Sequence, residues 1–193
     1  ARLTGRAGKF SVGALNIQTG DSPAAGAAAT NFSVVRVKRD FLRRSTFGVI
    51  ATRRSASLDA EGANTAFGLD ANLAFFANLH INSYYALTRT PGVSGDDRSY
   101  RAQLDYAGDR YGLQVEHLAV GEHFRPEVGF LRREDFRRSF AQARFSPRPT
   151  AIKAIRKFGY EASFDYVTNG RRRLETREAQ LTFRSEFQNG DRF

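Results

Sequence analysis

The chain has 193 residues and carries 30 basic against 20 acidic side chains, for a formal net charge of +10. It contains no cysteine, which excludes a disulfide framework, a thiolate zinc site and a cysteine nucleophile. No apolar run approaches the about 20 residues that a transmembrane helix needs, and the mean hydropathy is -0.48. A membrane β-barrel is still compatible with this composition, because strands that alternate apolar and polar residues average to a polar value.

Strand patterns run along the chain from its start. Weaker strands are expected over 9–18, 31–40 and 46–55, before the clearest one at 67–75. There every second residue from Phe67 to Phe75 is apolar, whereas Asp70 and Asn72 fall on the other face. A period of two predicts a strand with two different environments, and a helix would scatter the same residues around its axis.

The same alternation continues toward the C-terminus. Thr168-Asn169-Gly170 is expected to be a hairpin turn, because Asn-Gly is a strong short hairpin signal. The count comes to about ten strands with no helix, treated as one domain over 1–193. The later strands are expected at 79–88, 100–106, 111–116, 136–146, 158–166 and 178–187.

The links between strands alternate in length. Long links are expected near 19–30, 56–63, 90–97 and 121–135, and shorter ones near 41–45, 76–78, 108–110 and 147–150. Outer-membrane barrels place short turns on the periplasmic side and long loops outside. The fold class predicted is therefore an all-β, antiparallel, up-and-down transmembrane β-barrel, with the long links extracellular. The link at 167–171 is shorter than this scheme expects.

The two faces of the strands support the same prediction. One face is rich in Phe, Tyr, Leu and Ala, with aromatic residues near the expected membrane edges at Phe75, Phe76, Tyr106, Tyr111 and Phe145, and also at Tyr84 and Tyr85. The other face carries charged and amide groups that need water or ion-pair partners. The residues predicted to line the lumen are Asp70, Asn72, Arg101, Gln103, Asp105, Gln114, Glu116, Glu161 and Asp165.

Several segments resemble an uncharacterised family of bacterial outer-membrane β-barrels. In that family the barrel typically follows a carbohydrate-binding module of the family-nine type and continues well past the position equivalent to Phe193. The resemblance implies an outer-membrane location, a chain that is one part of a larger barrel, and no catalytic residue to carry over. It rests on Ala1 to Arg6, Leu15 to Thr19, Asn31 to Asp40, Phe67 to Asn72, Thr90 to Asp97 and Pro126 to Arg133.

The longest link, 121–135, is the candidate functional loop, because long loops often carry function. It could fold into the lumen as a constriction, bind a glycan, or pack as an ordinary external loop. Its candidate residues are His123, Phe124, Arg125, Phe130, Arg132 and Arg133.

No catalytic, metal or cofactor site is predicted. Glu116 and His117 point to opposite faces of a strand and cannot share an ion, and no Gly-x-Ser-x-Gly elbow or phosphate-binding loop is present. Only Lys9, Lys38, Lys153 and Lys157 are lysine, so arginine supplies most of the positive charge. These arginines are spread over many strand ends, which favours lipid headgroups and lumen ion pairs over nucleic acid.

The function expected is a non-enzymatic outer-membrane channel, translocation or anchoring scaffold with a link to glycans. Its expected partners are outer-membrane lipid and lipopolysaccharide, with a glycan or a partner protein in the lumen. Two alternatives stay open: a soluble basic β-module that binds nucleic acid, and a barrel-borne surface hydrolase. The hydrolase would use the loop carboxylates Glu122, Glu127, Glu134 and Asp135.

Overall fold

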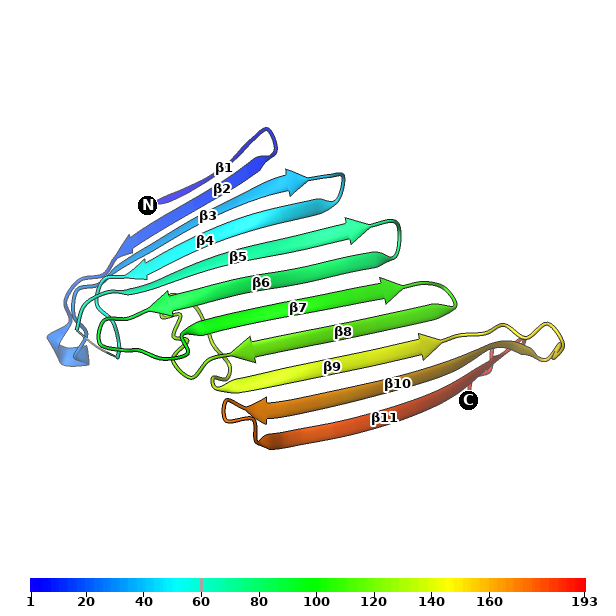
Figure 1. The fold of residues 1–193 in the computed structure, drawn as a ribbon. Helices are drawn as coiled ribbons and strands as arrows, with labels where there is room; N and C mark the ends of the chain where they lie inside the picture. Colours follow the sequence, from blue (N-terminus) through cyan, green and yellow to red (C-terminus); the bar gives the residue numbers. More distant parts are fainter. Residues whose placement is uncertain (60) are drawn as a thin grey trace. The chain divides into compact units, whose positions relative to one another are not determined.

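The computed structural model describes residues 1–59 and 61–193, and its described part is all-β apart from one short 3₁₀ turn, Pro23–Ala25. Eleven antiparallel strands follow one another in a single up-and-down sheet that is not closed into a barrel (Figure 1). No described helix has the length and hydrophobicity needed to cross a bilayer. The strands are β1 Arg2–Ala7, β2 Phe10–Gln18, β3 Asn31–Phe41, β4 Ser45–Arg54, β5 Asn64–Phe75, β6 Leu79–Arg89, β7 Arg98–Ala107, β8 Tyr111–Val120, β9 Phe136–Phe145, β10 Ile155–Asn169 and β11 Leu174–Phe187.

The chain divides into two compact units. The first comprises Ala1–Leu73, Asn82–Arg101 and Ala119–Phe136, and the second comprises Ala74–Ile81, Ala102–Leu118 and Arg137–Phe193. The contacts described below lie within one unit or the other.

The prediction of about ten strands missed β1, which pairs with β2 from Arg2 opposite Leu15 to Ala7 opposite Phe10. Leu3 is its one large apolar residue, so no alternation marks it in the sequence. The last hairpin also differs from the prediction. β10 continues through Asn169, and the turn lies at 170–173, where Asn169 Oδ1 accepts the N–H of Arg173 at 2.9 Å.

Link lengths follow the predicted alternation through the first eight links. The short links 8–9, 42–44, 76–78 and 108–110 lie at one end of the strands, here called the turn end. The described residues of the long links, 19–30, 55–59 with 61–63, 90–97 and 121–135, lie at the other, the loop end. The last two links reverse the pattern, because 146–154 is the longer one and 170–173 the shorter. After β11, Ser185 and Phe193 exchange two backbone hydrogen bonds of 2.7 and 2.9 Å, so the final residues pair along the edge of β11.

Strand register separates two faces. In β3, β4 and β5 the facing residues Val37, Val49 and Leu69 lie on one side, here called the apolar face. Lys38, Gly48 and Asp70 are also opposite one another and lie on the other side, the polar face. The same division holds in the second unit, where Tyr160 faces Phe183 and Glu161 faces Thr182.

The apolar face is exposed. Val49 and Leu69 are 52% and 58% exposed, and large exposed apolar side chains occur on every strand except β9. Among the described residues the buried apolar side chains are only Ala119, Val120 and Phe124. A chain of this size that folds in water would normally hide such side chains in a core. In the described part of the chain, no second layer covers the apolar face.

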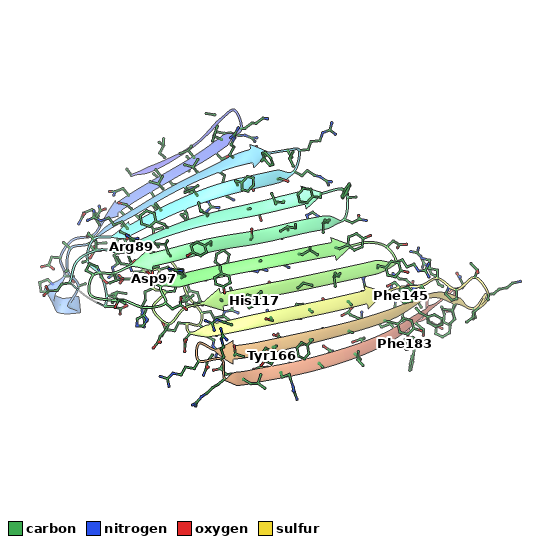
Figure 2. The ribbon with its side chains drawn as sticks, in the orientation of Figure 1. Arg89, Asp97, His117, Phe145, Tyr166 and Phe183 are labelled. Atoms are coloured by element: carbon green, nitrogen blue, oxygen red, sulfur yellow. The ribbon has the colours of Figure 1, made fainter. Side chains whose placement is uncertain are left out.

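Aromatic residues form a row on the apolar face of the second unit. The rings of Tyr111 and Phe145 stack with centroids 5.3 Å apart, and Tyr160 follows with centroid distances of 6.2 Å to Phe145 and 5.1 Å to Phe183. Arg110 lies over the first two rings. The row crosses four strands at their turn end, and Figure 2 shows Phe145 and Phe183 there, away from His117 and Tyr166.

The first unit has aromatic residues at the same end of its strands. Phe41 and Phe47 flank the β3–β4 turn with centroids 5.5 Å apart, and Phe10 lies under Arg39. Tyr84 differs from the predicted interfacial set, because it lies on the polar side and its hydroxyl is 3.0 Å from Ser99 Oγ.

Candidate functional site

Several charged side chains of the polar face are paired across strands. In the first unit Arg36 of β3 reaches Asp70 of β5, with 2.5 Å between Nη2 and Oδ1. Gly48 of β4 lies between them, and a Cβ there would be 2.5 Å from Asp70 Oδ1 and 2.8 Å from Arg36 Nη2. The absence of a side chain at Gly48 therefore allows the ion pair to span the middle strand.

A second group of charges lies on the polar face of the second unit. Arg138 of β9 donates from Nε and Nη2 to Asp165 of β10, with distances down to 2.6 Å, and from Nη1 to Glu116 of β8 at 3.3 Å. The Glu116 side chain is only 8% exposed. Further along, Gln142 donates to Glu161 at 2.7 Å. Charges that would be costly alone thereby satisfy one another.

The remaining residues of the predicted lumen set lie nearby in the strands. Asn72 lies on the same face of β5 as Asp70. Arg101 and Gln103 lie on the same face of β7 as Ser99. Asp105 and Gln114 line a cavity of about 160 Å³ together with Glu161. The sequence predicted that arginines such as Arg36 and Arg138 suit lipid headgroups and ion pairs with the lumen carboxylates, but it could not assign each arginine to its partner, since pairing across strands leaves no local signal.

The 121–135 loop is held at the loop end of the first unit. Its first residue, Gly121, donates its N–H to Arg98 O at 2.8 Å, and a Cβ there would lie 2.1 Å from Asp96 O. Only glycine permits this close approach. His123 donates its backbone N–H to Asp96 O at 2.9 Å, and the Phe124 side chain is buried.

Two fully buried polar side chains of the strands bind the loop backbone. Asn64 of β5, 0% exposed, donates from Nδ2 to Arg125 O at 2.8 Å and to Thr90 Oγ1 at 2.8 Å. Thr88 of β6 accepts the N–H of Arg125 at 3.0 Å and donates to His123 O at 3.3 Å. Asn64 lies on the same face of β5 as Asp70, so the loop is fixed to the polar side of the sheet.

Glu127 anchors the middle of the loop to the β4–β5 link. Its carboxylate accepts hydrogen bonds from Ser57 Oγ and from the N–H of Leu58, the latter at 2.9 Å. Arg54 Nε lies 3.7 Å away, and the Glu127 side chain is 4% exposed. A carboxylate this buried is stabilised by the N–H donor and the guanidinium.

The outer part of the loop borders an open cleft of about 490 Å³. Arg125 pairs there with Glu134 at 2.9 Å and with Asp59 at 3.4 Å. Arg132 and Arg133 also line the cleft and are exposed at its rim. Phe130 is 87% exposed, and it does not line the cleft.

The loop candidates therefore fall into two groups: His123, Phe124 and Arg125 hold the loop in place, whereas Phe130, Arg132 and Arg133 reach its surface. Of the four carboxylates named for a hydrolase, Glu127 pairs with Arg54 and Glu134 pairs with Arg125. Asn64 and Thr88 were missed as loop contacts, although the alternation of β5 could have placed Asn64 on the polar face.

The chemistry-bearing residues elsewhere do not converge. His117 lies on the opposite side of β8 from Glu116 and its Nδ1 is 2.9 Å from Ser139 Oγ. Within 1–59 and 61–193 no group of three or more His, Asp or Glu side chains is arranged to hold a metal ion.

The chain matches no family model, no curated protein and no solved structure.

Proposed function

We propose that this chain is part of a bacterial outer-membrane β-barrel whose apolar face contacts lipid and whose polar face lines a hydrated interior. The observation that supports the proposal is the difference between the two faces of the sheet, with aliphatic and aromatic side chains exposed on one face and charged side chains paired on the other. Strands of nine or more residues from β2 onward suit a tilted passage through a bilayer, which needs about 9–11 residues.

The aromatic row at the turn end supports the same proposal. Tyr and Trp rings are enriched where hydrocarbon meets headgroups, and arginine beside them can reach lipid phosphates. Arg110 over Tyr111 and Phe145, and Arg39 over Phe10, have this arrangement. In lipid both outer edges of the sheet would have to be paired, because unpaired backbone groups are too costly there.

The role proposed is passage of small water-soluble solutes, with anchoring as the simpler form of the same scaffold. The resemblance to the uncharacterised barrel family adds an association with glycans, which rests on that resemblance alone. No enzymatic step is proposed.

Fractionation and electrophoresis test the proposal. The native protein should appear in the outer-membrane fraction, require detergent for extraction, and migrate differently in SDS gels before and after boiling. Purified protein should then insert into planar bilayers. Recovery as a monodisperse, detergent-free monomer would overturn the membrane assignment, and strong salt-dependent binding to DNA would favour the nucleic-acid alternative.

A further inference from the structure

We propose that the 121–135 loop is a fixed constriction of the barrel interior, and that its rim arginines influence which ions pass. This inference rests on the proposed function and adds to it the element that would limit passage. The contacts that support it all lie within the first unit.

The first step is the side of the sheet on which the loop is held. Arg54 and Asn64 face one another in the β4–β5 register, on the same side as Gly48 and Asp70. A Cβ built at Gly68 would be 3.7 Å from Ala86 Cβ, which places the even-numbered residues of β6, including Thr88, on that side as well. Arg54, Asn64 and Thr88, which all contact the loop, therefore lie on the polar face.

The second step is that the loop is fixed at several points. Its start is tied to Asp96 and Arg98, and its next part is bonded to Asn64 and Thr88. Its middle is tied to the β4–β5 link through Glu127. A loop that joins β8 to β9 is thus held against β5, β6 and the link before β5. A buried polar side chain that loses its hydrogen-bond partner costs free energy, so the bonds from Asn64 and Thr88 to the loop backbone keep the loop in one position.

The third step is the charge at the surface of the loop. Arg125 is paired with Asp59 and Glu134, and Glu127 lies beside Arg54. Arg132 and Arg133 are exposed and line the cleft, and the Arg133 guanidinium also lies over the Phe136 ring. Charged side chains at a narrow point set the sign of the ions that pass most easily. These two arginines therefore favour anions.

The main test is conductance of the native protein in planar bilayers. In one variant, residues 122–133 are replaced by a short Gly-Ser link. Its single-channel conductance should be at least about twice that of the wild type, and it should admit larger polyethylene glycol probes. The N64A/E127Q variant should also admit larger polyethylene glycol probes, with Glu122→Ala, exposed in the same loop, as the matched control for probe size. A change in mobility on boiling confirms that each variant is folded.

A second variant tests the charge without altering the anchors. R132E/R133E should move the reversal potential in a KCl gradient toward cation preference, whereas R171E/R173E, in the β10–β11 link, should leave it unchanged. Equal conductance of the wild type and the loop-replaced protein, including the case in which both are closed, would overturn the constriction. An unchanged reversal potential in R132E/R133E would overturn the charge effect. Failure of the wild type to enter membranes at all would instead reject the proposed function.

Discussion

The two faces of the sheet satisfy their side chains in opposite ways. On the polar face Arg36 is matched to Asp70, and Arg138 to Glu116 and Asp165, so each of these charges has a partner supplied by another strand. On the apolar face Val49 and Leu69 have no layer above them. The first face is stabilised by directed contacts, whereas the second leaves apolar side chains in contact with solvent, which is unfavourable in water. Under the proposed function, a bilayer supplies the cover that a second layer of structure supplies in a water-soluble fold.

The largest loss of stability is expected from removing Arg138, the basic residue that Glu116 and Asp165 share on the polar face. Arg138→Ala leaves Glu116 and Asp165 without their guanidinium, and breaking a buried pair costs about 3–5 kcal/mol. The loss should fall near the lower limit because the Arg138 side chain is 36% exposed. Urea unfolding in lipid vesicles measures it.

The matched control for that variant is Arg137→Ala, one residue away on the other face of β9. It should change the free energy of unfolding much less. Equal losses in the two variants would mean that the ion pairs of the polar face contribute no special stability.

A charge placed on the apolar face should have the next largest effect. Leu69→Arg puts a guanidinium where lipid is expected, at a cost of about 2–4 kcal/mol near the bilayer centre. The measurement is the folded fraction in vesicles across a urea titration. Asn72→Arg, on the polar face of the same strand, should cost less than about 1 kcal/mol. An unchanged Leu69→Arg protein would contradict contact with lipid.

Closing the gap at Gly48 should have a smaller effect. Gly48→Val introduces carbon atoms into the space of the Arg36–Asp70 pair and is expected to cost about 1–3 kcal/mol through overpacking. Gly13→Val in β2 is the control, because a Cβ there meets nothing within 4 Å. Thermal or urea midpoints of the two variants give the comparison, and equal shifts would show that the ion pair tolerates the added side chain.

The smallest effect is expected at the turn end, where the side chains of the Arg148–Asp109 pair are mostly exposed. Hydrogen bonding to Arg148 lowers the pKa of Asp109 below its usual range. Because the folded-state pKa is lowered, any stabilisation is present above the ordinary carboxyl range and is lost as the pH falls through the lowered pKa. Asp109→Asn should leave the unfolding midpoint at neutral pH almost unchanged, since exposed ion pairs contribute little. An NMR titration of Asp109 in wild type and R148A checks the direction of the pKa shift.

Local sequence patterns were enough to predict the all-β class, most of the strands, the antiparallel order and the face of most strand residues, with Tyr84 as an exception. The reason is that the period of two in segments such as 67–75 is a local property of the chain. It could not mark Arg2–Ala7, where one large apolar residue gives no alternation, nor the extension of β10 beyond the expected Asn-Gly turn.

Which side chains meet could be learned only from the folded sheet. Arg36 and Asp70 are far apart in the chain and come together because β3 and β5 lie on either side of β4, where Gly48 leaves room for the ion pair. Asn64 reaches Arg125 only because the 121–135 loop lies across β5 and β6. Such contacts depend on strand order and on the path of a long loop, which are properties of the assembled sheet rather than of any short segment.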